Sequence, residues 1–273
     1  MSRIYMQFPG GKALAVTLSY DDGVRQDAQL IEIMQKNGLK GTFNLNSGRF
    51  GVDNRLLQQE AVALYVGSGM EVAVHSVSHP YLAMLPSDLC AKEILMDRIA
   101  LEDTFDMFVR GMAYPEGSYN DDVVAAAKQC GIVYARTAKS TGRFDLPQDW
   151  MQLAPTCHHN DSRLMELARR FVETNQNRTP KLFYLWGHSY EFDDDQNWDT
   201  ITNFAEFIGN REDVWYATNI EIYDYATAYR RLIFRMSEKK VHNPTNQTVY
   251  FLVGDDLHCV KPGATSEIRS VCL

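Results

Sequence analysis

Two pairs of side chains in this sequence have the residue types and spacing of a metal centre. Adjacent carboxylates, Asp21 and Asp22, follow the apolar run at residues 13–18, and two imidazoles, His75 and His79, follow another apolar run. Zinc accepts imidazole nitrogens and carboxylate oxygens as ligands, and catalytic zinc sites keep a further position for water or substrate. The second carboxylate is then available as a base. These residues therefore predict metal-dependent hydrolytic chemistry.

The elements that must position these side chains alternate along the chain. Short apolar runs predict strands at residues 13–18, 41–45, 70–74, 111–114, 132–137 and 182–186. Helical patterns lie between or after them, at residues 26–37, 87–105, 121–130, 162–174 and 220–234. This order predicts parallel strands joined by helices, and loops at the carboxyl ends of such strands meet at one edge. We therefore expect the polar side chains that follow the strands to share one site.

The composition limits the classes of partner. The 273 residues carry a formal net charge of −8, and 45% of them are hydrophobic, which is typical of a large soluble α/β domain. Nucleic acids and anionic membranes attract basic surfaces, so we expect neither as a partner. The N-terminal residues lack the apolar core of a signal peptide, and the five cysteines lack a CxxC pair. We therefore expect a cytoplasmic protein, with export left open.

The pattern changes near the C-terminus. Residues 236–273 contain short apolar runs separated by turn residues, which predicts a small β-rich appendage after a main unit at residues 1–235. The sequence leaves open whether this appendage covers a groove or serves as a contact in a homo-oligomer.

The two motifs resemble those of the polysaccharide deacetylase family, carbohydrate esterase family 4, whose homology domain also occurs in chitooligosaccharide deacetylases. The family's first motif, an aromatic residue followed by Asp-Asp-Gly, corresponds to residues 20–23, and its second, histidine-rich motif corresponds to residues 75–80. The resemblance covers about residues 12–235. It implies an α/β fold, a distorted (β/α) barrel with about seven parallel strands.

The resemblance also implies a role for each residue of the predicted site. Asp22, His75 and His79 would hold a divalent metal, with zinc as the first choice. Asp21 would be the general base, and His188, at the end of an apolar strand, would be the acid that protonates the departing amine. The implied reaction is removal of an N-acyl group, in the first place acetyl, from an amino sugar in a glycan or oligosaccharide.

The chain departs from the family in its third and fourth motifs. Ala113 stands where many members have an arginine that pairs with the catalytic aspartate, and Arg143 is our candidate replacement. In the fourth motif an aspartate orients the acid histidine and an aromatic residue lines the groove. The resemblance assigns the first role to Asp145 or Asp149 and the second role to Trp150.

Other residues are candidates for binding the substrate. Tyr114, Pro115 and Glu116 correspond to the third motif, where the family uses a backbone donor for the oxyanion, although Glu116 replaces an aromatic residue. Trp186 lies close to His188 in the sequence and is suited to stacking on a sugar ring. We assign His158 to the wall of the groove.

Each feature also has an alternative explanation. Asp-Asp-Gly is common turn chemistry, and the two histidines could begin a solvated helix. His158 and His159 could form a second metal cluster, but adjacent side chains of this kind rarely converge, so we favour a groove-lining or structural role. We interpret the acidic run at residues 191–195 as a solvated loop.

Two other functions fit the same sequence. One is hydrolysis of a small non-peptide amide or cyclic imide, which the altered third motif keeps open. The other is binding of a sugar by a protein whose catalysis is weakened because the motif arginine is missing.

Overall fold

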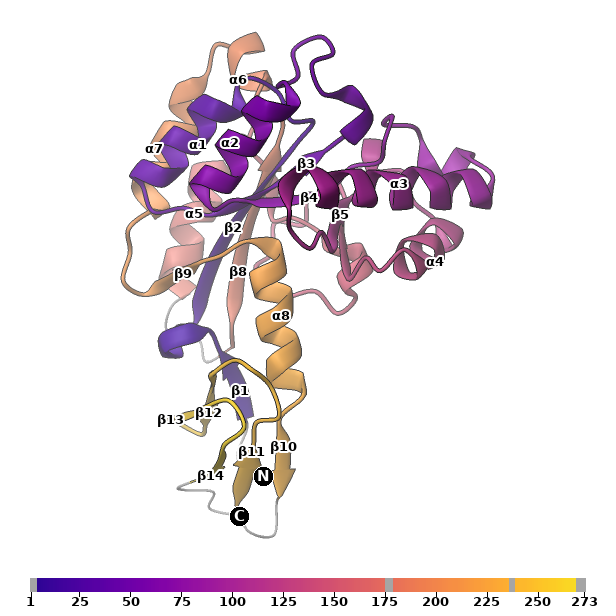
Figure 1. Ribbon diagram of the computed structural model, residues 1–273. Coiled ribbons are helices and arrows are strands. Elements are labelled where there is room, and N and C mark those ends of the chain that lie inside the picture. Colours follow the sequence, from indigo (N-terminus) through magenta and orange to yellow (C-terminus); the bar gives the residue numbers. More distant parts are fainter. Residues whose placement is uncertain (1–3, 175–178, 236–238, 269–273) are drawn as a thin grey trace.

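Eight parallel strands form the centre of the protein in the computed structural model, which describes residues 4–174, 179–235 and 239–268 (Figure 1). They are β2 (Leu14–Asp21), β3 (Gly41–Leu45), β4 (Glu71–Val74), β5 (Gly111–Ala113), β6 (Tyr134–Arg136), β7 (Cys157–His158), β8 (Lys181–Gly187) and β9 (Val214–Tyr216). Seven follow one path in the order β6-β5-β4-β3-β2-β8-β7, and β9 pairs with β2. The prediction of a distorted barrel with about seven parallel strands is confirmed.

The distortion arises at strand β2. Strand β8 pairs with one edge of β2, and strands β9 and β3 share its other edge. Leu14 to Val16 pair with β9, and the later residues from Leu18 to Asp21 pair with β3. At the β6 end of the sheet path, the Leu153 amide donates to the Ala135 carbonyl over 2.9 Å. A few residues later in the chain, β7 pairs with β8 at the other end of the path. Residues 153–158 therefore connect β6 to β8 and bring the two ends of the sheet together.

Helices cover the barrel because their apolar positions recur on one side. In α5, for example, Leu164, Leu167, Ala168 and Phe171 are all buried, at the spacing of a single helix face. The helices are α1 (Asp27–Lys36), α2 (Gln58–Ser68), α3 (Ser87–Phe105), α4 (Asp121–Gln129), α5 (Leu164–Glu173), α6 (Glu191–Asp194), α7 (Trp198–Ile208) and α8 (Asn219–Arg230). Short 3-10 turns are η1 (Pro9–Gly11), η2 (Ser47–Arg49), η3 (Leu82–Met84), η4 (Pro115–Gly117) and η5 (Trp150–Gln152).

The last predicted helix is shorter than expected. α8 begins with a capping box, in which Thr218 and Glu221 each accept the other's backbone N–H, but it ends at Arg230 instead of continuing to residue 234. The predicted helix is too long because residues 233–235 form a strand that pairs with a later strand. The acidic run at residues 191–195 is also not a loop, because most of it forms α6, whose Phe192 is fully buried.

Antiparallel strands lie beyond the end of α8, away from the carboxyl ends of the barrel strands (Figure 1). They form two sheets, with the orders β1-β12-β13 and β10-β11-β14. The strands are β1 (Ile4–Gln7), β10 (Ile233–Arg235), β11 (Lys240–His242), β12 (Val249–Val253), β13 (Asp256–Val260) and β14 (Thr265–Glu267). β1 and β10 thus pair with strands from the C-terminal region, and the domain division at residue 235 stays a prediction.

None of the helices in the described ranges combines the length and apolar character that a bilayer crossing requires. The expected cytoplasmic location stays a prediction.

Candidate metal centre and active site

The three predicted metal ligands meet at the carboxyl edge of the barrel. Asp22 follows β2, and His75 and His79 follow β4, with β3 between these strands. One ligand atom from each residue lies within 4.8 Å of the other two. The backbone has a positive φ of 81° at Asp22 and of 62° at His79, so tight left-handed turns direct these side chains.

His75 is held with one nitrogen free for a metal. Its Nδ1 lies 2.9 Å from the Ala113 carbonyl, which can only accept, so the proton of the neutral ring is on Nδ1 and the lone pair is on Nε2. Burial lowers the pKa of His75 to about 4, which keeps the ring neutral. Its backbone amide donates to the buried carboxylate of Asp97 in α3 over 3.0 Å. The ring is therefore fixed in position and protonation state as a metal ligand requires.

The surroundings of Asp22 also fit a bound cation. Its Oδ1 is buried, has no hydrogen-bond partner and lies 3.8 Å from Nε2 of His79. An unpaired carboxylate oxygen out of contact with water is costly unless something positive meets it. Two imidazole nitrogens and this oxygen form a donor set suited to zinc or a similar divalent ion.

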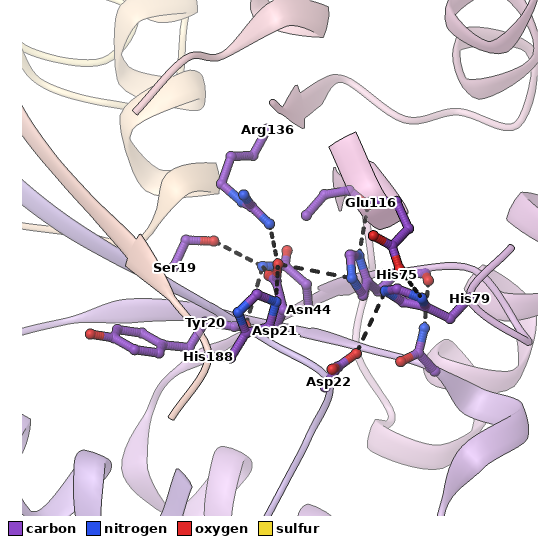
Figure 2. A network of polar contacts seen from close by, with 12 residues as sticks. Ser19, Tyr20, Asp21, Asp22, Asn44, His75, His79, Glu116, Arg136 and His188 are labelled. Atoms are coloured by element: carbon purple, nitrogen blue, oxygen red, sulfur yellow. Dashed lines mark hydrogen bonds and ion pairs between the residues drawn. The ribbon is translucent and has the colours of Figure 1, made fainter. Parts of the chain in front are cut away.

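Asp21 lies beside the ligand set and is held as an ion by other groups. Burial alone raises the pKa of its carboxyl, but the charge of Arg136, aided by His75, His188 and a hydrogen bond from Asn44, holds that pKa below its ordinary value. Figure 2 shows these side chains pointing toward Asp21 from separate elements. Asp21 therefore remains a charged acceptor next to the site where a metal would bind.

Arg136 supplies the cation that the third motif lacks. It lies at the end of β6 and donates through Nη2 to Oδ2 of Asp21, and both residues are at most 2% exposed. Our expectation that Arg143 fills this place was wrong, because Arg136 occupies it and Arg143 is exposed in the loop after β6. A single arginine inside an apolar strand was the available signal, since charged residues are rarely buried without a partner.

Glu191, rather than an aspartate of the fourth motif, contacts the predicted acid His188. Its Oε1 lies 3.3 Å from Nδ1 of His188, whereas Nε2 of that ring lies 3.8 Å from Oδ2 of Asp21. Burial lowers the pKa of His188, but the contact with Glu191 and the charge of Asp21 outweigh burial and raise it. Asp145 instead pairs with Lys181, and Asp149 caps η5, so neither orients His188. The spacing of three residues from His188 to Glu191 was the signal in the sequence.

The two adjacent histidines converge on the same glutamate. Nε2 of His158 and Nε2 of His159 lie 3.2 and 3.0 Å from Oε2 of Glu191. His158, His188 and Glu191 also have the spacing of a metal site, but the Asn160 amide donates to Nδ1 of His158 over 3.2 Å. The proton of the neutral His158 ring must then be on Nε2, where it donates to Glu191 and blocks a metal. The contacts of Glu191 with the histidines hold its pKa well below the ordinary value, although burial opposes this.

A cavity of about 460 Å³ opens over these groups, large enough for one or two sugar rings. Its wall includes the predicted residues Tyr114, Glu116, Trp186 and His188. Pro115 is buried in η4 between the first two of these. The expectation that Trp150 and His158 line the groove was wrong, because neither is among the residues that line this cavity. Trp150 packs against Tyr223 at another part of the surface, and His158 makes an edge-on contact with Trp186 in the histidine cluster.

Fold and site together define a (β/α)-barrel protein with a candidate metal centre beside a charged aspartate. Residues 10–135 match the family model of polysaccharide deacetylase, which confirms the predicted resemblance to this family. The match includes both aspartates and both candidate metal-ligand histidines and ends one residue before Arg136.

One curated relative and two solved structures are similar to parts of this chain. Chitin deacetylase 1 of Cryptococcus neoformans var. grubii is 30% identical over 116 residues, which are 42% of this chain and only 24% of that protein. A putative polysaccharide deacetylase from Mycobacterium smegmatis has the same fold, with a TM-score of 0.62, 17% identity, and coverage of 84% of this chain and 96% of the other. The Xyl-CE4 domain of a multidomain xylanase from the hindgut metagenome of Trinervitermes trinervoides also has this fold. Its TM-score is 0.52 and its identity 16%, with coverage of 79% of this chain and 92% of the other.

The ligand geometry predicts one tightly held zinc ion per chain after reconstitution and dialysis, as measured by elemental analysis. His79→Ala removes one of three protein ligands and should weaken zinc binding by more than about 100-fold, beyond the usual effect of losing an outer partner. His158→Ala is the matched control, because that ring is a donor to Glu191, and it should retain the ion. Full retention of zinc by His79→Ala, or its loss from His158→Ala, would contradict the assignment.

Proposed function

We propose that this protein is a metal-dependent hydrolase that removes an N-acetyl group from an amino sugar in a glycan or oligosaccharide, with zinc as the metal. The observation that carries the proposal is the position of Asp21, next to a His-His-Asp ligand set but not part of it. The chitin deacetylase relative supports an N-acetylated sugar as the substrate, and the acidic overall charge is compatible with a neutral one.

Each side chain has a task that its contacts suit. A divalent ion held by Asp22, His75 and His79 would polarise the acyl carbonyl and acidify a water molecule. Asp21, charged and unligated, accepts the proton of the attacking water. His188 donates from Nε2 to the departing amine, because Glu191 fixes the other nitrogen of the ring. A deprotonated base, Asp21, and a protonated acid, His188, thus lie close to each other in the site.

The alternative of a catalytically weakened sugar-binding protein rested on the missing motif arginine. Arg136 supplies that charge, so this reason no longer applies. Its guanidinium also lies 4.4 Å from the ring centre of Trp186, which fixes an aromatic surface in the cavity wall. Such a surface is suited to packing against the apolar face of a sugar ring.

The proposed reaction predicts that zinc-loaded protein releases acetate from N-acetylglucosamine oligomers. Asp21→Asn should keep the zinc but lower kcat by about 10²–10⁴-fold, because the proton acceptor is lost. Acetate assays and elemental analysis of the same samples check both expectations. Undiminished activity of Asp21→Asn would refute the base. Turnover of small amides or cyclic imides without acetate release from any N-acetylated sugar would favour the other hydrolase function.

The buried ion pair predicts that Arg136→Gln lowers both kcat and stability. Removing one partner of a buried pair leaves an uncompensated charge, which costs about 3–5 kcal/mol. Arg136→Lys keeps the charge and should recover part of both losses, while Arg143→Gln should resemble the parent protein. Urea unfolding and acetate release measure the two effects. Equal losses in the Arg136→Gln and Arg143→Gln proteins would disprove the pairing.

The contact between Glu191 and His188 predicts that a substitution of Glu191 shifts the alkaline limb of the pH profile of kcat. The acid must be protonated, so kcat falls as the pH rises through the pKa of His188. Since Glu191 raises that pKa, Glu191→Gln should move the limb to lower pH. Asp194→Asn, an exposed acid in the same helix, should leave the limb in place. An unshifted limb in Glu191→Gln would show that Glu191 has no effect on the acid.

A further inference from the structure

Two arginines from a single segment line the cavity beside the metal centre. Arg49 ends η2, and Arg55 lies in the loop that leads to α2. This loop is attached to the Asp-Asp-Gly turn, because the Leu56 amide donates to the Gly23 carbonyl over 3.0 Å. The Arg25 amide likewise donates to the Asn54 carbonyl over 3.0 Å. The fold therefore fixes this arginine-bearing segment directly against the catalytic edge.

Arg55 is largely enclosed, yet its hydrogen-bonding capacity is only partly used. Its side chain is 16% exposed, and its Nη2 lies 3.2 Å from Oδ2 of Asp22. Its Nε is buried and has no hydrogen-bond partner. Because the charge of Asp22 is shared with the metal that this residue is proposed to hold, Arg55 retains positive charge for another anion. An acceptor on a bound ligand would satisfy this guanidinium nitrogen.

The charge of Arg49 is also weakly compensated. Its Nη2 lies 3.8 Å from Asp53, beyond hydrogen-bond distance, and the Asp53 side chain is 71% exposed. Exposed pairs of this kind are strongly screened by solvent. Among the acids in the cavity wall, Asp21 is paired with Arg136, and Glu116 lies on the side of His79. In a chain with a net charge of −8, the part of the wall formed by Arg49 and Arg55 is basic, although Asp22 contacts Arg55.

We propose that the cavity takes an N-acylated sugar that itself carries an anionic group, a carboxylate or a phosphate, and that Arg49 and Arg55 bind this group. The proposal rests on the function proposed above and specifies its substrate class. The planar guanidinium presents paired N–H donors that match both kinds of oxyanion. Two arginines on one wall would also orient the sugar relative to the metal and Asp21.

The test compares three substrates on one scaffold: N,N′-diacetylchitobiose, the same disaccharide oxidised to a C6 carboxylate, and its 6-phosphate. We expect kcat/KM for at least one anionic form to exceed that of the neutral form by about 10- to 100-fold, as charge-assisted hydrogen bonds allow. The preferred form distinguishes a sugar carboxylate from a sugar phosphate. Equal values for all three substrates would overturn the proposal and leave the deacetylase function intact.

Arg49→Gln is the informative variant, because Arg55 also contacts the metal ligand Asp22. We expect it to reduce the ratio of anionic to neutral kcat/KM by about tenfold or more. Arg211→Gln is the matched control: its side chain is 33% exposed against 31% for Arg49, and it pairs with Asp213 in the loop before β9. This control should keep the ratio. An unchanged ratio in Arg49→Gln would refute the role of this residue and the proposal.

Calorimetry separates this proposal from the proposed reaction. The three disaccharides are titrated into zinc-loaded Asp21→Asn protein, with and without Arg49→Gln. Tighter binding of an anionic form that depends on Arg49 supports anion recognition even if no acetate is released. Equal binding of all three forms contradicts it whether or not the protein is a deacetylase.

Discussion

The ion pair between Asp21 and Arg136 is the interaction on which the site depends. A carboxylate removed from water becomes protonated unless a cation or several donors compensate it, and Asp21 is only 2% exposed. The compensating arginine comes from β6, at one end of the sheet path, whereas Asp21 ends β2 near the middle of that path. The charged state of the proposed base is therefore a property of the curled barrel and not of strand β2 alone.

The site combines two sets of residues with different origins. The candidate metal ligands follow β2 and β4, and Asn44 of β3, between them, donates to Asp21 over 2.8 Å. The groups that would control proton transfer come from the later part of the chain, where Arg136, His188 and Glu191 lie on β6, after β8 and in α6. The family match at residues 10–135 covers the first set alone. The later set supplies the arginine that is missing at Ala113 and the carboxylate that contacts the proposed acid.

This division also explains what the sequence could predict. The ligands were recognisable because metal chemistry restricts residue types and because each follows an apolar strand. The strands themselves were recognisable from their apolar runs, apart from short ones such as β7 and β9, which hydrogen bonds to longer neighbours define. Arg136 was missed because its partner Asp21 lies across the barrel, and local spacing does not encode such a contact. Glu191 was missed because the acidic run at residues 191–195 was interpreted as a solvated loop, although Glu191 lies only three residues after His188. Arg143 and Asp149 were chosen by sequence position, but the folded chain turns them to other partners.

The left-handed backbone at Asp22 has a consequence for how this lineage can change. A φ of 81° excludes most side chains, but glycine, asparagine and aspartate adopt such conformations at little cost. Asparagine has nearly the same shape as aspartate and differs by a single nucleotide in the codon, yet it carries no charge. The turn would thus tolerate the exchange, although Arg55 would lose the charge that it contacts over 3.2 Å. Selection for the reaction adds a second reason to keep an acid at this position, and descendants freed from that demand could drift into inert proteins that keep the barrel.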